Sequence, residues 1–171
     1  MRIFKSNQKG RSRAQTMVEF ALVLPILLVI VYGVLEVGRL ILTYSIVVSA
    51  SREAVRYGSA TGLNAGIVRY CDTNGIKAAA QNVDFIGVIE DANIDICYDN
   101  GSGCPPPPPP SVTCPLALID PCPPASSVSG NRIVVTVCTL FTPLAAIVPL
   151  NKITITSFNA RTIIGSVLIL P

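Results

Sequence analysis

Residues 17–42 read MVEFALVLPILLVIVYGVLEVGRLIL, and this stretch decides the fold because it is long and apolar enough to cross a bilayer. About 20 apolar residues span a hydrocarbon core, and the run carries no charge between Glu19 and Glu36. Pro25 lies inside the run, where membrane helices tolerate the kink that a proline introduces. The sequence therefore predicts a transmembrane helix over residues 15–43.

A basic leader, residues 1–14, precedes this run. It holds five basic residues and no acid, whereas the rest of the chain holds eight basic and ten acidic residues, so the net charge of +3 comes from the leader. Positive flanks stay in the cytoplasm, so we expect the N-terminus inside and residues 44–171 outside the cytoplasmic membrane. The run is longer than the apolar region of a secretory signal and lacks an A-x-A site, which favours a signal anchor, or a leader clipped before the helix, over a removed signal peptide.

The transmembrane run is predicted to continue as an amphipathic helix to about Gly58. A helix from Gln15 to Gly58 would extend about 65 Å, roughly twice a hydrocarbon core. Its outer half should therefore pack on an extracytoplasmic domain through one face. The expected buried face consists of Tyr44, Val47, Val48, Ser51, Ala54, Val55 and Gly58, opposite Ser45, Ser49, Arg52, Glu53 and Arg56.

The chain beyond the helix predicts a small α+β head. Residues 71–81 read as a short helix, and apolar residues alternate with polar ones in 93–98, 132–138 and 153–160. The alternation of the third segment changes phase at Phe158 and Ala160, which predicts a β-bulge. We expect an α+β fold in which the long N-terminal helix packs on a small antiparallel sheet.

A Pro- and Cys-rich arm, residues 99–130, is inserted between the first two predicted strands. Its six consecutive prolines, 105–110, favour an extended polyproline II rod. A loop of this length inside a compact domain is often functional. Because no basic residue is interleaved with the prolines, a rigid projecting spacer is favoured over a recognition ligand.

All six cysteines lie beyond the transmembrane run, in the compartment where disulfides persist. Six cysteines allow 15 pairings, and we expect only that those of the arm are tied within or near it. With no histidine and no C-x-x-C pair, zinc-ligand spacing is absent. The disulfide candidates are Cys71, Cys97, Cys104, Cys114, Cys122 and Cys138.

The composition argues against catalysis and against nucleic-acid binding. Without histidine there is no Ser/His or Cys/His dyad, and no glycine-rich phosphate loop is present. Between Tyr70 and Asn131 the only basic residue is Lys77, against seven acids, which disfavours nucleic acid as a partner. We expect no enzyme activity, cofactor, metal or small-molecule substrate. The carboxylates expected to be merely solvated are Asp84, Glu90, Asp91, Asp95, Asp99 and Asp120.

Residues 12–20, SRAQTMVEF, resemble the processing site of type IV prepilins. In that family a membrane aspartic peptidase removes a short basic leader after a small residue, and the fifth residue of the mature chain is Glu. A cut after Ala14 makes Gln15 the first residue and Glu19 the fifth, followed by Phe20 in the assembly segment. The family usually has Gly before the cut; a rival cut after Gly10 would place Gln15, not a carboxylate, fifth.

Further segments resemble the TadE-like pseudopilins of the tight-adherence (Tad) pilus: GVLEVGR at 33–39, SREAVRY at 51–57 and, more loosely, VTVCTLFTPL at 135–144. The resemblance implies a pilin-like fold, with the prepilin peptidase, other Tad pilins and pseudopilins, and the assembly platform as partners in the inner membrane. It implies a minor pilin or pseudopilin that serves pilus assembly and surface adhesion or secretion. The alternative is an uncleaved, signal-anchored, disulfide-bonded binding module outside the cytoplasm.

Two acids of the helix have candidate roles. Cleavage would place the ammonium of Gln15 one helical turn from Glu19, and the amine of an incoming subunit could neutralise Glu19 of a neighbour in an apolar surround. The alternative for Glu19 is a solvated acid at headgroup depth. Glu36 and Arg39, at spacing i, i+3, form a candidate ion pair that either ends the membrane span or contacts a partner pilin.

Overall fold

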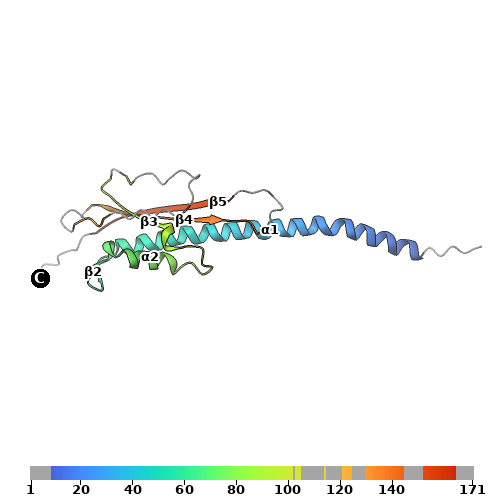
Figure 1. The fold of residues 1–171 in the computed structure, drawn as a ribbon, viewed down its shortest axis with the longest axis horizontal. Coiled ribbons are helices and arrows are strands. Elements are labelled where there is room, and N and C mark those ends of the chain that lie inside the picture. Colours follow the sequence, from blue (N-terminus) through green and yellow to red (C-terminus); the bar gives the residue numbers. More distant parts are fainter. Residues whose placement is uncertain are drawn as a thin grey trace, which may run out of the picture. The chain divides into compact units, whose positions relative to one another are not determined.

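The computed structural model describes residues 9–101, 103–104, 114, 121–124, 130–144 and 152–164, with the backbone alone for 9–14. The described chain divides between Arg39 and Leu40 into two compact units. A long helix with small antiparallel sheets confirms the predicted α+β class (Figure 1). The elements are α1 (Lys9–Ser59), β1 (Leu63–Asn64), β2 (Ile67–Val68), the 3-10 helix η1 (Arg69–Cys71), α2 (Thr73–Gln81), the 3-10 helix η2 (Asp91–Asn93), β3 (Ile94–Asp99), β4 (Arg132–Phe141) and β5 (Ile153–Thr162).

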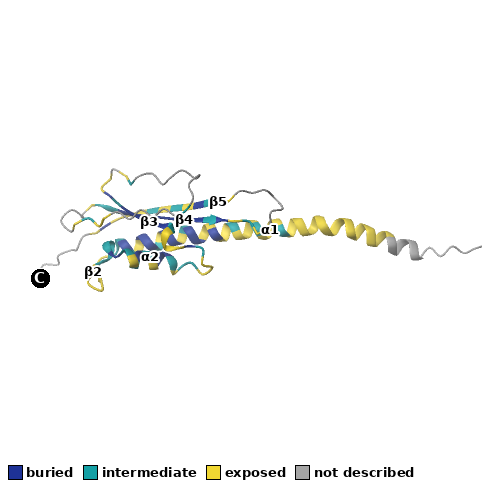
Figure 2. Cartoon of the chain, in the orientation of Figure 1, coloured by how far each residue is buried: buried dark blue, intermediate teal, exposed yellow. Residues whose placement is uncertain are grey.

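The first unit consists of the N-terminal segment of α1. Every side chain from 15 to 31 is exposed, and large apolar residues such as Leu28 and Val34 are 58% and 68% exposed (Figure 2). Within the described residues α1 is the one helix that is long and apolar enough to cross a membrane, and none of its most apolar 18-residue window is buried. Pro25 lies inside this helix, as predicted.

The second unit packs the C-terminal segment of α1 between a sheet and a short helix. The sheet is three-stranded and antiparallel with the order β3-β4-β5, and Figure 1 shows it on one side of this segment of α1 with α2 on the other. Ala50 and Ala54 of α1 are fully buried in the core, so small side chains allow its other elements to pack close to the helix. The central residues of the core are Val47, Val55, Ile76, Ile94, Ile96, Ile133, Val135 and Val137.

The buried face of α1 differs somewhat from the predicted face. Val47, Ser51, Ala54 and Val55 are buried as expected, but Tyr44 is 57% exposed. The buried face also includes residues 43, 46 and 50, which recur with residue 54 at spacings of three and four. Periodicity alone left the position of this stripe uncertain by about one residue around the helix.

The short helix predicted over 71–81 is confirmed as η1 followed by α2. Asp72 caps α2, because its Oδ1 accepts a hydrogen bond from the Gly75 backbone N–H at 2.9 Å. Just before it lies the β1–β2 hairpin, whose central residues Ala65 and Gly66 have φ values of 48° and 84°. Positive φ at both central positions is the two-residue hairpin geometry that matches strand twist.

The predicted bulge in β5 is wrong. β5 pairs with β4 in one continuous register from Thr162 opposite Arg132 to Ile153 opposite Phe141. The polar residues Ser157 and Asn159 stay on the face toward α1, where the Ser51 hydroxyl bonds to the Ser157 hydroxyl at 3.0 Å and accepts from Asn159 Nδ2 at 2.7 Å. The change of hydrophobic phase therefore reflects a polar cluster between helix and sheet, and not an extra residue.

Candidate functional site

The N-terminal segment holds the residues predicted for leader cleavage and assembly. The Ala14–Gln15 peptide bond lies within α1. Gln15 Nε2 donates a hydrogen bond to Glu19 Oε1 at 3.0 Å, so groups four residues apart meet on this helix. Both residues and Phe20 are exposed, which leaves the Glu19 carboxylate accessible to a second chain. The roles of Ala14, Gln15, Glu19 and Phe20 remain predictions.

Glu36 and Arg39 form an ion pair on α1. Arg39 Nη1 lies 3.2 Å from both carboxylate oxygens of Glu36, and the Glu36 side chain is 11% exposed whereas that of Arg39 is 43% exposed. The pair lies at the C-terminal end of the first unit. This geometry agrees with an acid held beside a cation where the apolar run ends, while the role of the pair at a membrane boundary stays a prediction.

Three disulfides tie the Pro- and Cys-rich arm to the head. They join Cys97 to Cys104, Cys114 to Cys138 and Cys71 to Cys122, with Cα–Cα distances of 6.1, 6.3 and 5.4 Å. Each bridge connects one arm cysteine to a cysteine outside the arm, so pairing within the arm does not occur. No cysteine is free. The hexaproline, 105–110, lies outside the described residues, so the projecting spacer stays a prediction.

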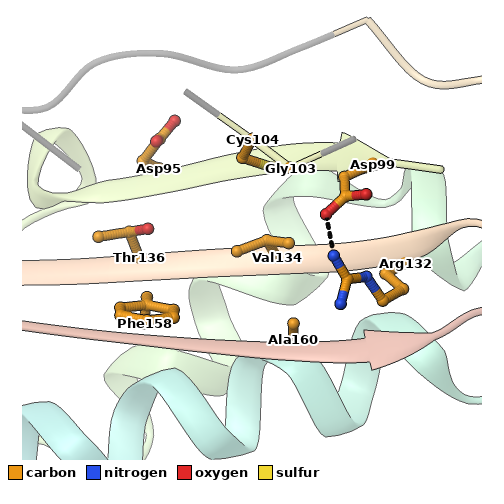
Figure 3. A pocket seen from close by; sticks show the side chains of 9 residues that line it. All are labelled: Asp95, Asp99, Gly103, Cys104, Arg132, Val134, Thr136, Phe158 and Ala160. Atoms are coloured by element: carbon orange, nitrogen blue, oxygen red, sulfur yellow. Dashed lines mark hydrogen bonds and ion pairs between the residues drawn. The ribbon is translucent and has the colours of Figure 1, made fainter. Parts of the chain in front are cut away.

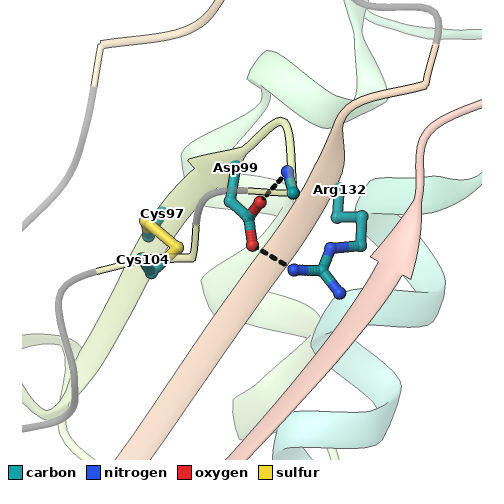
Figure 4. Close-up of polar contacts among 5 residues, drawn as sticks. Cys97, Asp99, Cys104 and Arg132 are labelled. Atoms are coloured by element: carbon teal, nitrogen blue, oxygen red, sulfur yellow. Dashed lines mark hydrogen bonds and ion pairs between the residues drawn. A yellow bond between two sulfur atoms is a disulfide. The ribbon is translucent and has the colours of Figure 1, made fainter.

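The root of the arm is fixed on the face of the sheet that points away from α1. Cys97, Asp99 and Arg132 all belong to this face, and Figure 4 shows the Cys97–Cys104 bridge beside the Asp99–Arg132 ion pair. The chain turns back after β3 through Gly101 and Gly103, whose φ values of 105° and 86° favour glycine. The arm therefore begins by folding back against the strand that it leaves.

The prediction that Asp99 is solvated is wrong. Its side chain is 2% exposed, it accepts a hydrogen bond from the Gly101 amide, and Arg132 Nη2 lies 2.5 Å from its Oδ2. These contacts, the Gly101 amide first, hold the pKa of Asp99 below its usual value. Asp99 and Arg132 pair across β3 and β4 directly opposite each other, which sequence periodicity could not specify without the strand register.

A shallow pocket of about 220 Å³ lies on the same face, as Figure 3 shows. The exposed ring of Phe158 borders it together with Thr136, Val134 and the Asp99–Arg132 pair. Asp99 is kept ionised by its partners, so it is a poor general base. Among the described residues no group of three or more His, Cys, Asp or Glu side chains could hold a metal.

A second buried carboxylate, Asp72, joins α1 to the hairpin and α2. Its Oδ2 accepts hydrogen bonds from Asn64 Nδ2 at 2.6 Å and from the Tyr57 hydroxyl at 2.7 Å. The bond from Asn64, followed by those from Tyr57 and Gly75, lowers the pKa of Asp72 below its ordinary value. The bond to Asp72 conversely raises the pKa of Tyr57. This cluster connects structural elements and has no sequence signature, because its members are brought together by the fold.

Comparison with known proteins finds a match for the N-terminal region of the chain. Residues 14–56 match the family model described as TadE-like protein, which confirms the resemblance inferred from the same segment. The match covers about a quarter of the chain and includes Glu19, Glu36 and Arg39. No curated protein and no solved structure matches the chain.

Proposed function

We propose that this protein is a minor pilin or pseudopilin that takes part in the assembly of a Tad-type pilus, in support of surface adhesion or secretion. Residues 14–56 match TadE-like proteins, which indicates a structural protein associated with the Tad pilus in a membrane context. The observation that carries the proposal is the coincidence of this match with an exposed apolar helix that bears Glu19 near its start. Further partners would be the prepilin peptidase, other Tad pilins and the assembly platform.

The protein would be inserted in the inner membrane by α1, with the basic leader in the cytoplasm and the disulfide-bonded head outside. The disulfides support this orientation, because such bonds persist outside the cytoplasm. A helix with apolar side chains on all sides needs either lipid or the helices of neighbouring subunits around it. Transfer of α1 from the membrane into a fibre would therefore exchange one apolar surround for another.

Glu19 would act as the assembly residue. After cleavage at Ala14–Gln15, the new ammonium of an incoming subunit would pair with Glu19 of its neighbour, away from water. Glu19 is exposed on the helix and accepts a hydrogen bond from the Gln15 side-chain amide, so its carboxylate can be reached by polar groups near it, which supports this role. The pair would set the axial register of the subunit, because neither charge finds another partner in an apolar surround.

Intact-mass analysis of the protein purified from its native host tests leader removal. The proposal predicts a chain that begins at Gln15. A chain that retains Met1 would favour the alternative, an uncleaved membrane-anchored binding module outside the cytoplasm, and would contradict the proposed role of the Gln15 ammonium.

The variant Glu19→Ala tests assembly separately. Membrane insertion should be unharmed, since the change removes a polar group that costs about 2.5 to 3.5 kcal/mol at a bilayer centre. Pilin co-purification should be lost, because an unpaired buried ammonium costs about 3 to 5 kcal/mol. Gln15→Ala is the matched control: it removes the side-chain amide but keeps the α-amine, so assembly should survive. Unchanged pilin association in Glu19→Ala would leave Glu19 a solvated boundary acid.

A further inference from the structure

A groove with a net positive charge runs along the head between α1 and β5. It consists of two adjoining hollows of about 290 and 490 Å³ that share Arg56 and Arg161 in their lining. Arg52 and Glu53 of α1 line one hollow, and Thr162 and Ile164 line the other. We name this feature, lined by Arg52, Arg56 and Arg161, the basic groove.

The charge of the basic groove is only partly neutralised within the head. Glu53 pairs with Arg56 at 2.5 Å, whereas no carboxylate of the described residues forms an ion pair with Arg52 or Arg161. All three arginines are exposed. Three guanidinium groups against one carboxylate leave a charge of about +2, which attracts an acidic partner over roughly one Debye length, about 8 Å at physiological salt.

The groove also follows an open edge of the sheet. β4 pairs with one edge of β5, and no strand of the described residues pairs with the other. β5 runs through ten residues without a proline or a bulge, so it lacks two of the devices that commonly protect an edge. The unpaired backbone groups along this edge are therefore available as hydrogen-bond partners, in addition to charge, for a segment that enters the groove.

The same head exposes a loop with complementary charge. Residues 82–93 contain Asp84, Glu90 and Asp91 and no basic residue, and Glu90 and Asp91 are exposed. The loop is fixed in shape, because Asp84 accepts hydrogen bonds from the backbone N–H groups of Ile86 and Ile89, and Asp91 accepts one from Gln81. Phe85, 75% exposed, lies on this loop and offers apolar area beside the charges. We name residues 82–93 the acidic loop.

We propose that the acidic loop of one copy of this protein docks in the basic groove of a second copy. The charges of the two surfaces are opposite, about −3 on the loop and about +2 in the groove, which favours this orientation and opposes contact between two like surfaces. The contact is made by the heads. It therefore goes beyond the proposed pilus function and requires neither leader cleavage nor Glu19.

Two neutralising variants of the full chain in a neutral detergent test the proposal by sedimentation velocity. The groove variant carries Arg56→Gln with Arg161→Gln, and the loop variant carries Glu90→Gln with Asp91→Asn. Each alone should self-associate about tenfold more weakly than the wild type, since exposed charge pairs contribute modestly one by one. Mixing the two variants should restore pairing, because the intact loop of one meets the intact groove of the other.

The control Lys152→Gln removes a positive charge at the opposite end of β5, about 30 Å from Arg161 at 3.3 Å per residue, and should leave association unchanged. Raising the salt concentration to 0.5 M, roughly a 4 Å Debye length, should weaken the wild-type contact. Association that is equal in all variants and insensitive to salt would belong to α1 and would overturn the proposal. So would a monomeric wild type, or a mixture that restores nothing.

Discussion

The two segments of α1, residues 15–39 and 40–59, share one backbone conformation but satisfy their side chains in opposite ways. In the N-terminal segment apolar residues are exposed on all sides, as in Val34 at 68%. In the C-terminal segment a single stripe is buried completely, as in Val47 and Ala54 at 0%. The difference shows that helix formation is common to both segments, while the head core selects the residues of the buried stripe in the C-terminal segment only.

The largest expected effect is a loss of stability in the head alone when the Cys71–Cys122 disulfide is removed. Replacing Cys71 and Cys122 by Ser should lower the free energy of head unfolding by about 4 kcal/mol, because this bridge closes the longest loop, 51 residues. Hydrogen exchange of amides in residues 15–39 should not change. The matched control is Cys97→Ser with Cys104→Ser, whose separation of 7 residues predicts about 2 kcal/mol. Equal losses would contradict the loop-length argument.

A smaller effect is expected from the same substitution made in each segment. Val47→Ala should lower the free energy of head unfolding by about 2 kcal/mol, since it removes buried methyl groups and leaves a cavity. Val34→Ala, on the exposed segment, should leave head unfolding unchanged. Thermal unfolding of the full chain in detergent, followed by near-ultraviolet circular dichroism of the tyrosines, measures both. A loss in Val34→Ala as large as in Val47→Ala would show that the two segments are not independently stabilised.

A smaller effect is expected at the polar cluster of Ser51, Ser157 and Asn159, which lies between the C-terminal segment of α1 and β5. Ser51→Ala should cost about 1 to 2 kcal/mol, because it leaves Ser157 and Asn159 with lost hydrogen bonds inside the head. Ser49→Ala, an exposed position two residues earlier on the same helix, should be nearly neutral. Urea unfolding of the two variants decides this; an equally neutral Ser51→Ala would mean that the cluster does not stabilise the packing of helix on sheet.

The smallest effect is a dependence of head stability on pH. The folded pKa of Asp72 lies below its unfolded value of about 3.9, so its contribution is present above that pH and is lost as the pH falls through the folded pKa. Urea midpoints measured downward from pH 5 should therefore decline, and Asp72→Asn should reduce this decline. Ser49→Ala, which removes no ionisable group, should leave the decline as in the wild type. Identical curves for wild type and Asp72→Asn would contradict the argument.

Much of the fold follows from local patterns. The uncharged run between Glu19 and Glu36 predicts α1, and alternation predicts all three strands of the sheet within a few residues. The predictions of the helix and the strands succeed because hydropathy and periodicity depend on neighbours along the chain. The candidate assembly residues Glu19 and Phe20, which came from the resemblance to type IV prepilins, stay predictions.

The predictions that failed concern groups that meet across strands or across layers. A bulge was expected in β5 because Ser157 and Asn159 interrupt the apolar alternation, yet Ser51 on α1 completes their hydrogen bonds. Asp99 was expected to be solvated, but Arg132, opposite it in the register, pairs with it. Each residue alone has several possible partners, and only the pairing of strands and the approach of α1 select one.

The sequence by itself determined that an apolar helix of membrane length leads into a small α+β head that holds all six cysteines, because length and composition carry that information locally. The tertiary structure decided which of the 15 cysteine pairings forms, which face of α1 is buried, and that Arg52, Arg56 and Arg161 line one groove. The physical reason is that these features join residues far apart in the chain, and their proximity arises only when the layers of the head pack together.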